Sequence, residues 1–567
     1  MLAICCMSLF IVSMDGTVVN VALPSIRADF GATVADLQWV VDAYSLTIAS
    51  ILLLSGSMGD RLGRRRVFQL GLVVFSIGSL LCSVAPSIGF LIFARVIQGL
   101  GGSMLNPVAM SIITNTFTVP KERARAVGVW GAVIGVSMAF GPLVGGALTE
   151  TVGWRSVFWV NVPIGIAAII LCAVFVPESR AAKTRRFDAL GQVFVIVALV
   201  SLVFGLIEAP RLGWGSPQII GLFVLSAVAV LLFIRHERRI REPLIDVRFF
   251  RSFPFSAATI TALCGFAAYG AFLFVNALYL QDVRGLSAFD TGFYMLPLAL
   301  ATLVASLISG RLVGRFGTRP SLIVAGTLIA ASAFSMTFLT ATTPTYMLVI
   351  SYVLFGIGFG AINAPITATA VSGMPLSQAG VAAGVASTSR QTGAAIGVAL
   401  AGTVTGAGAM AIIGPSFAIA THALWYISIG CGIVIVVLGI MASTPWAHRT
   451  TASIGHLLEE PAVAAAAAVA AETALASSAS RAGTAARAEP ASRVGTAAPA
   501  GTAAASAGST AAMTSAAADL DGRADGRTDG PTDARADGQL VMRNSAQPEM
   551  PLSAVHSTRA SDDGSTR

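Results

Sequence analysis

Long apolar runs alternate with short polar segments along the chain from Met1 to about Ser443. Each run holds about 20 residues, the length that an α-helix rising about 1.5 Å per residue needs to cross a hydrocarbon core about 30 Å thick. The pattern predicts an all-α polytopic membrane protein. We expect fourteen spans, beginning near Met1, Asp36, Val67, Ser87, Val127, Ser156, Ala189, Pro217, Pro254, Thr291, Ser321, Tyr346, Ala383 and Phe417.

The first apolar run resembles a signal peptide only in its hydrophobicity. No basic residue precedes the run from Met1 to Val12, and no small-residue cleavage site follows before Pro24. A secretory signal needs both features. We therefore expect this run to be retained as the first span, and the position of the true start codon, here or upstream, stays open.

The basic residues test the span count, because cytoplasmic loops carry an excess of lysine and arginine. With fourteen spans and both termini inside, twenty basic residues fall in cytoplasmic connections and four in outer ones. Removing one span would invert every later loop and bring the two numbers close together. The cytoplasmic set is Arg61, Arg64, Arg65, Arg66, Lys121, Arg123, Arg125, Arg180, Lys183, Arg185, Arg186, Arg235, Arg238, Arg239, Arg241, Arg248, Arg251, Arg311, Arg315 and Arg319. The outer set is Arg27, Arg155, Arg211 and Arg284.

The composition agrees with a membrane protein, since 55% of the residues are hydrophobic and 11% are charged. The net charge of +8 would suggest nucleic-acid binding in a soluble chain, but these basic residues lie in short loops between apolar spans,. We therefore expect no nucleic-acid partner. The six cysteines lie in apolar segments without the paired spacing of a metal or redox site, so we expect no metal and interpret them as small buried hydrophobes,.

A short polar segment occurs twice. GSMGDRLGRR at residues 56–65 aligns with GRLVGRFGTR at residues 310–319, with glycine and arginine at the same offsets. Internal repeats in a helical membrane protein are typical of transporters whose substrate site lies between two halves near the midplane. The second copy has Gly314 where the first has Asp60, so the two segments need not have the same function.

The predicted organisation has four parts. Residues 1–176 form an amino-terminal six-helix half, residues 177–252 two extra spans and a cytoplasmic linker, and residues 253–443 a carboxy-terminal six-helix half. Residues 444–567 are a low-complexity mixture of Ala, Gly, Thr, Ser, Asp and Arg. Such a composition cannot bury a core, so we expect a disordered cytoplasmic tail.

The first copy of the repeated segment packs charges between two apolar spans. Its arginines can be simple topological anchors that contact anionic headgroups, or they can bind carboxylates within a gate. A topological anchor has no use for a negative charge, so we expect Asp60 to control a cytoplasmic gate, where it caps or faces the positive end of a helix. The predicted gate residues are Gly56, Asp60, Arg61, Gly63, Arg64 and Arg65.

The sequence GPLVGG in the fifth predicted span removes side-chain bulk from one helix face. Gly141, Pro142, Gly145 and Gly146 would let a neighbouring helix approach closely,. Tight packing alone is one explanation of such a motif. The functional alternative is a helix seam that closes one face of a transporter.

Four charged residues lie well inside predicted spans, where a charge costs about 2.5–3.5 kcal/mol on insertion scales. At about 1.5 Å per residue, Asp15, Asp42 and Arg95 reach similar depths in the amino-terminal half,. Two carboxylates beside one guanidinium are a credible proton site, because burial strengthens and a nearby cation weakens proton binding. A static ion pair between Arg95 and one aspartate is the alternative. The fourth residue is Arg390, beside Gln391.

Six motifs resemble the major facilitator superfamily, and within it the fourteen-span drug:proton antiporters. The resemblance covers residues 15–444. The motifs are DGTVVNVALP at 15–24, GSMGDRLGRRR at 56–66, RVIQGLGGS at 95–103, GPLVGG at 141–146, WRSVFWVNVPIG at 154–165 and GVASTSRQTG at 384–393. The first is similar to the signature of the drug antiporters, and GPLVGG is typical of antiporters.

The resemblance implies the major facilitator fold and proton-coupled efflux of drugs, antibiotics or similar amphiphiles, with Asp15 and Asp42 as the acidic residues. Relatives that export dicationic drugs carry further acids in the thirteenth span, where this chain has Arg390 and Gln391. This difference favours neutral, zwitterionic or anionic substrates. We expect a monomer in the plasma membrane, with both termini cytoplasmic and partners limited to the substrate and the lipid bilayer.

Other functions are less well supported by the sequence. A proton-coupled uptake symporter on the same fold is the main alternative, whereas a proton-independent facilitator leaves Asp15 and Asp42 unexplained. A sensor or scaffold would need a folded cytoplasmic module. Motifs for hydrolases, metalloproteases and phosphate-binding loops are absent, so we expect neither an enzyme nor direct ATP drive. No cofactor is expected, and protons are the coupling ion.

Overall fold

A computed structural model describes residues 1–180, 188–240, 243–372, 374, 378–405, 414–447 and 449–451. Four basic residues used in the charge count, Lys183, Arg185, Arg186 and Arg241, lie outside these ranges, as does the predicted tail from residue 452 onward. The side chain of Lys121 is likewise not described.

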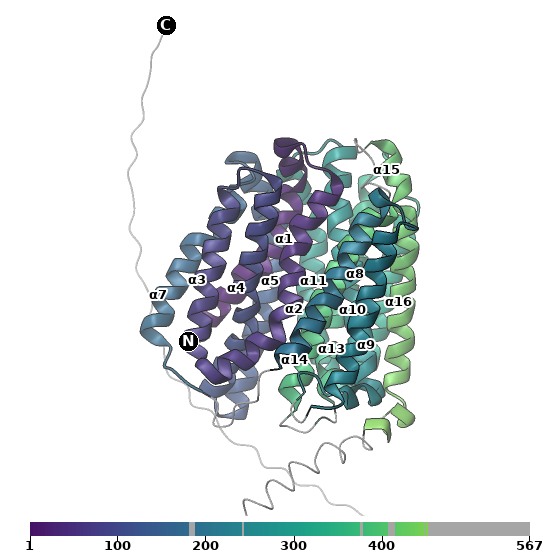
Figure 1. Ribbon diagram of the computed structural model, residues 1–567. Helices are drawn as coiled ribbons and strands as arrows, with labels where there is room; N and C mark the ends of the chain where they lie inside the picture. Colours follow the sequence, from purple (N-terminus) through teal and green to yellow (C-terminus); the bar gives the residue numbers. More distant parts are fainter. Residues whose placement is uncertain are drawn as a thin grey trace, which may run out of the picture. The chain divides into compact units, whose positions relative to one another are not determined.

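Helices make up all regular structure in the described part of the chain (Figure 1). The first half of the bundle contains α1 (Leu2–Phe30), α2 (Val34–Leu62), α3 (Arg64–Ser83), α4 (Ile88–Thr116), α5 (Pro120–Thr151), α6 (Ser156–Trp159) and α7 (Asn161–Phe175). Then follow α8 (Ala189–Leu212), α9 (Pro217–Glu237) and the short 3-10 helix η1 (Val247–Arg251). The rest comprises α10 (Phe253–Leu278), the π-helical turn η2 (Tyr279–Val283), α11 (Ala288–Phe316), α12 (Thr318–Met336), α13 (Thr345–Val371), α14 (Ala379–Val404), α15 (Pro415–Ala420) and α16 (His422–Ala442).

Polar side chains fix where several helices begin. Thr33 and Asp36 form a reciprocal capping box at the start of α2, and the hydroxyl groups of Ser87, Ser216 and Ser287 accept hydrogen bonds at the starts of α4, α9 and α11. Such caps satisfy backbone N–H groups that have no partner within the helix. Most helices therefore begin within a few residues of the positions predicted from the hydrophobic pattern.

Two boundaries differ from the prediction. Pro24, expected at the outer end of the first span, lies inside α1, which continues to Phe30 and ends at Gly31 in the left-handed conformation. Helix α5 begins at Pro120 rather than near Val127. A proline fits the first turn of a helix, and polar residues extend helices beyond the apolar part that crosses the membrane.

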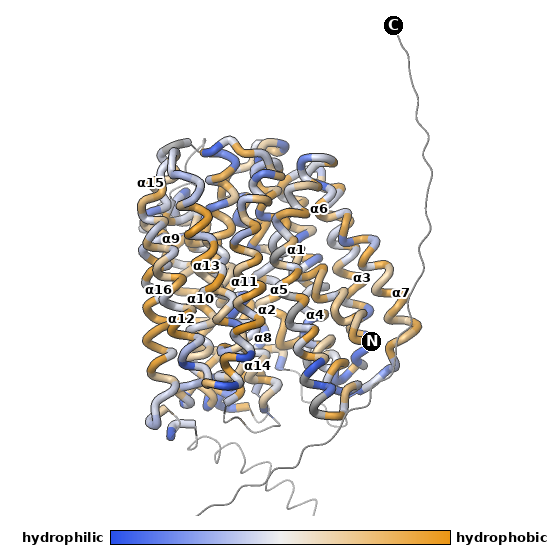
Figure 2. Tube along the Cα trace, turned by 180° about the vertical axis from the view of Figure 1, so that it is seen from behind, coloured by the Kyte–Doolittle hydropathy of each residue, from blue (hydrophilic) through white to orange (hydrophobic). Residues whose placement is uncertain are grey.

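Thirteen of the described helices are long and apolar enough to cross a membrane. The remaining predicted span corresponds to α14, which has 26 residues but carries the polar sequence STSRQTG at its centre. Helix α14 packs against α10, α2 and α8, so other helices cover much of its surface. Figure 2 shows hydrophilic residues gathered at both ends of the bundle and hydrophobic residues between them. The protein is a multi-pass membrane protein.

The packing of the first six spans is repeated in the last six. Helix α1 packs on α5 as α10 packs on α14, α2 on α4 as α11 on α13, and α3 on α4 as α12 on α13. The repeated polar segment holds the same place in both copies. It breaks the chain between α2 and α3 at Gly63 and between α11 and α12 at Gly317, with φ angles of 112° and 77°. The structure thus supports an internal repeat.

The most extensive contacts between the repeats are those of α5 with α11 and of α2 with α14, and α1 also contacts α10 and α11. Helix α8 packs against both α2 and α14, and α9 packs on α8. At one end of the bundle, the carboxylate of Asp282 in η2 lies 3.1 Å from the guanidinium of Arg27 in α1, and the Gln281 amide donates a hydrogen bond to the carbonyl of Val21. We call this the Arg27 end and the opposite one the Gly63 end.

Candidate functional site

The strongest polar contact inside the amino-terminal repeat joins α1 to α4. The guanidinium of Arg95 lies 2.5 Å from the carboxylate of Asp15, and each side chain is at most 1% exposed. Asp15 lies near the middle of the 29-residue helix α1. The predicted depth match between these two residues therefore corresponds to direct contact.

Amide groups complete the partners of Asp15. The side-chain amides of Gln98 and Asn161 donate hydrogen bonds of 2.8 and 2.9 Å to one carboxylate oxygen, and both also donate to the hydroxyl of Ser79. The Gln98 carbonyl in turn accepts a hydrogen bond of 2.7 Å from Arg95. The Asp15 network thus draws on α1, α3, α4 and α7, and both oxygens of its carboxylate are occupied.

Arg95 is also fixed on its other sides. Its Nε donates a hydrogen bond of 3.0 Å to the carbonyl of Val40 in α2. The guanidinium carbon lies 4.2 Å from the ring centroid of Tyr44 and 5.7 Å from that of Phe158, within the range of a cation–π interaction,. Charge, hydrogen bonds and aromatic faces together hold the guanidinium in one place.

Asp42 does not join the Asp15 network. Its side chain is 0% exposed, and neither carboxylate oxygen has a hydrogen-bond partner among the described residues. The expected cluster of two carboxylates around one guanidinium is therefore corrected to a pair, Asp15 with Arg95, and a separate acid on α2. Equal depth along different helices does not determine which way each side chain points.

The predicted gate at the Gly63 end has a one-residue break between two helices. Residues 56–62 complete α2, and α3 begins at Arg64. The carboxylate of Asp60 accepts hydrogen bonds of 3.2 and 3.0 Å from the Arg64 guanidinium one turn further along. The side chain of Arg61 is exposed, and Gly56 lies against Pro107 of α4.

Glu178, not Asp60, faces the start of α3. Its carboxylate accepts a hydrogen bond of 3.2 Å from the backbone N–H of Arg65 and lies 3.6 Å from the Nε of Arg66. The guanidinium of Arg65 donates to the carbonyl of Ala173 near the end of α7, where positive charge is favoured,. The positive φ favours glycine at Gly63, and a Cβ there would lie 2.5 Å from a Glu178 oxygen, so any larger residue would displace this carboxylate,.

The four seam residues lie between α1 and α11. A Cβ at Gly145 would lie 2.9 Å from the carbonyl oxygen of Val18 in α1, and one at Gly146 would lie 2.9 Å from the Cα of Phe289 in α11. Gly141 faces Thr17, and Pro142 lies against Gly292. Helix α5 is thus packed backbone-to-backbone against both repeats, as small residues in membrane helices allow.

Arg390 and Gln391 lie halfway along α14, and both side chains are half-buried. The guanidinium of Arg390 donates a hydrogen bond of 2.6 Å to the hydroxyl of Thr367 in α13. It makes no ion pair within the ranges that the structure describes. Arg390 thus differs from Arg95, whose charge is paired with Asp15.

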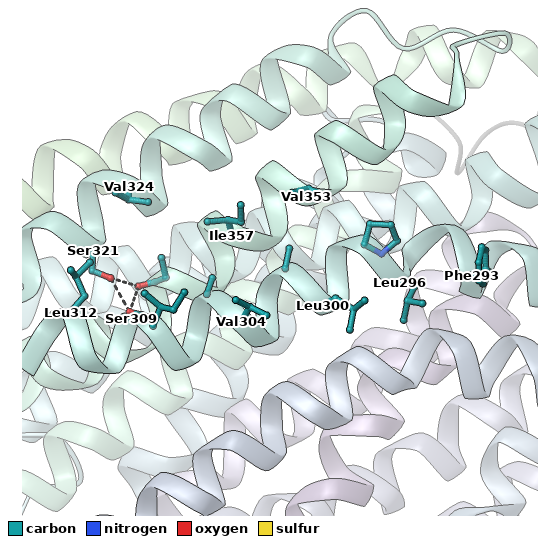
Figure 3. Close-up of a pocket in the computed structure, with 15 residues that line it drawn as sticks. Phe293, Leu296, Leu300, Val304, Ser309, Leu312, Ser321, Val324, Val353 and Ile357 are labelled. Carbon is teal, nitrogen blue, oxygen red and sulfur yellow. Dashed lines mark hydrogen bonds between the residues drawn. The ribbon is translucent and has the colours of Figure 1, made fainter.

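A groove of about 660 Å³ lies between α11, α12 and α13 (Figure 3). Its lining is almost wholly apolar and includes Leu300, Val304 and Val324, each more than 40% exposed. At one end, the hydroxyls of Ser309 and Ser321 both donate to the carbonyl of Ala361. The groove holds no charged side chain and lies apart from the Asp15 network, so it offers no proton-binding group.

A model of the Major Facilitator Superfamily matches residues 5–398. The chain belongs to this superfamily. The multidrug resistance protein Stp of Mycobacterium tuberculosis is 36% identical over 409 residues, 72% of this chain and 76% of the relative. The tetracenomycin C resistance and export protein of Streptomyces glaucescens is 36% identical over 382 residues, 67% and 71% of the two chains. The riboflavin transporter RibZ of Clostridioides difficile is 30% identical over 380 residues, 67% and 82% of the chains.

Membership of the major facilitator superfamily confirms the resemblance and the all-α transporter fold predicted from the motifs. The residues of the site that the sequence did not indicate include Gln98, Asn161 and Glu178. The first two stand inside motifs already noted, RVIQGLGGS and WRSVFWVNVPIG, so an amide within an apolar span was an available signal. Glu178 follows α7 in a polar segment, and no local pattern links it to Gly63.

Proposed function

We propose that the protein exports drugs, antibiotics or similar amphiphiles in exchange for protons, and that Asp42 carries the proton. The observation that supports this role is the contrast between the two acids. Asp15 has three donors and a buried countercharge, whereas Asp42 is fully buried with no partner among the described residues. An ion without a partner is costly in such surroundings, so protonation can be coupled to a conformational change.

The names of two relatives favour export, because one is a multidrug resistance protein and the other a resistance and export protein.

Asp42 lies on α2, and α2 packs against α14 across the junction of the two repeats. Proton binding there can therefore bias how the repeats meet. Inward movement of one proton supplies about 2.3 kcal/mol per 100 mV and about 1.4 kcal/mol per pH unit.

The Asp15 network takes a positioning role in this proposal. It binds four helices of the amino-terminal repeat together and anchors Val40, two residues before Asp42. The close packing of α5 on α1 and α11 forms the seam along which the two repeats separate,. Asp60, Arg64 and Glu178 hold α2, α3 and the chain after α7 together at the Gly63 end.

The excess of basic residues assigns the Gly63 end to the cytoplasm and the Arg27 end to the outside,. Both termini are then cytoplasmic, and the protein lies in the plasma membrane as a monomer, with the bilayer and its substrate as partners. Protons are the coupling ion, and no other cofactor or nucleic acid is required. The protein is a carrier and not an enzyme.

Export can be tested in cells that express the full chain or Asp42→Asn at equal levels. We expect the wild type to lower the accumulation of several amphiphilic antibiotics, and we expect a protonophore or Asp42→Asn to remove this effect. Uptake is the second candidate, since the name of the riboflavin transporter gives no direction of transport. Accumulation that rises on expression of the wild type would contradict export and support uptake.

A further inference from the structure

Arg390 holds a positive charge at the middle of the second repeat. It lies eleven residues after Ala379 and fourteen before Val404, about 16 and 21 Å from the two ends of α14,. This position is too deep for the guanidinium to serve as an anchor at the headgroups. Its side chain is nevertheless only half-buried, although α14 packs among α10, α2, α8 and α13.

All the hydrogen-bond partners of Arg390 in the described structure are neutral. One terminal nitrogen donates 2.6 Å to the Thr367 hydroxyl and 3.4 Å to the Asn363 carbonyl, and the other lies 3.5 Å from the Ser387 hydroxyl. The Nε is buried and has no acceptor. The guanidinium thus keeps unused donors, in contrast to Arg95, whose charge is paired with Asp15.

An aromatic surface adjoins this charge. The guanidinium carbon of Arg390 lies 6.0 Å from the ring centroid of Phe266 in α10, which is itself half-buried. Phe266 packs at 5.0 Å against Phe359 of α13, and Tyr269 stacks on Phe359 at 4.0 Å. The Arg390 guanidinium, which has unused hydrogen-bond donors, therefore lies at the edge of a continuous aromatic surface.

We propose that Arg390 binds the anionic group of an acidic aromatic amphiphile whose ring system lies against Phe266. A carboxylate or similar anion would fill the guanidinium's unused donors and neutralise a charge that is costly to bury alone. Since α14 packs against α2 across the junction of the repeats, the site lies where such a transporter places its substrate,. This inference rests on the proposed export function and names its substrate class.

Binding to the purified full-length protein tests the inference without relying on transport. We would reconstitute the protein in nanodiscs of phosphatidylcholine, whose headgroups carry no net negative charge, and measure binding of pyrenebutyric acid and other aromatic carboxylic acids, each beside its methyl ester. We expect the wild type to bind the acids about 10- to 100-fold more tightly than the esters, the loss expected for one charge-assisted hydrogen bond.

Two variants separate recognition from folding. Arg390→Gln should bind acid and ester equally, with the affinity for the ester unchanged. Arg390→Lys keeps the charge and should show an intermediate preference for the acid over its ester. It therefore provides the test if Arg390→Gln does not fold. Esters that bind the wild type as tightly as their acids, or an Arg390→Gln protein that loses both ligands equally, would overturn the inference.

Asp42→Asn should abolish coupled transport without changing the preference for acids over esters. Failure of the export proposal and failure of the anion site therefore give different results.

Discussion

The carboxylate of Asp15 and the guanidinium of Arg95 lie 2.5 Å apart in the interior of the amino-terminal repeat. Asp42, the second acid that the sequence places at a similar depth, takes no part in this contact. Two aspartates at similar depth thus have different surroundings. One has its charge balanced by a fixed partner, and the other has no partner among the described residues.

This difference predicts that the two conservative substitutions have very unequal effects on stability. Asp15→Asn leaves the Arg95 charge buried and unpaired, which should lower the free energy of unfolding by about 3–5 kcal/mol. Asp42→Asn removes no ion pair and should change it by less than about 1 kcal/mol. Thermal unfolding of both purified variants in the same detergent measures the difference, and equal losses would show that Asp42 is also a structural anchor.

A second pair of variants tests the break between α2 and α3. Gly63→Ala should cost about 1–3 kcal/mol for its positive φ and more for displacing the Glu178 carboxylate,. Gly317→Ala is the matched control, because this glycine also has a positive φ but has open space around it. The transition temperature should fall further for Gly63→Ala, and a larger fall for Gly317→Ala would exclude Glu178 as the cause.

The span pattern and the repeated segment could be predicted because apolar run length and glycine position act locally along the chain. The partner of Arg95 could not, because helix spacing gives depth but not the direction in which each side chain points. Glu178 reaches Gly63 from 115 residues further along the chain, a contact that only the packing of α7 on α3 creates. The polar sequence around Arg390 lowers the hydropathy of α14. The same sequence supplies the charge that we propose binds the anionic group of the substrate.

The seam on α5 gives a third prediction. A methyl group at Gly145 would press against the backbone of Val18, and overpacking of this kind costs about 1–3 kcal/mol,. Gly131, also on α5, has open space where a Cβ would lie. Gly145→Ala should therefore reduce transport several-fold at normal expression, while Gly131→Ala should transport like the wild type. Equal transport by both variants would show that the close packing of Gly145 against α1 is not needed for transport.

Acid should weaken the start of α8. Burial of Asp188 opposes its charge, but hydrogen bonds from the Gly191 N–H and the His236 ring outweigh it and hold the pKa of the carboxyl below its usual value. A carboxyl with a depressed pKa stabilises the fold above its ordinary pKa of about 3.9 and loses this contribution as the pH falls through the lower folded value. The free energy of unfolding of the wild type should exceed that of Asp188→Asn by about 0.3–1 kcal/mol at pH 7, which raises its transition temperature.

The control for this prediction is the same comparison below pH 4, where the difference should shrink as Asp188 takes up a proton in the wild type. A difference that does not change with pH would assign the effect to the cap geometry alone, because asparagine also accepts a hydrogen bond from Gly191.

The central claim is that Asp42 couples protons to export. Inverted membrane vesicles containing the protein would be energised to acidify their interior, and antibiotics would then be added while the internal pH is followed. We predict that substrates dissipate the pH gradient in wild-type vesicles and fail to do so with Asp42→Asn at equal protein level and equal substrate binding. Full dissipation of the pH gradient by the Asp42→Asn protein would contradict the role of Asp42 as the acid that couples protons to export.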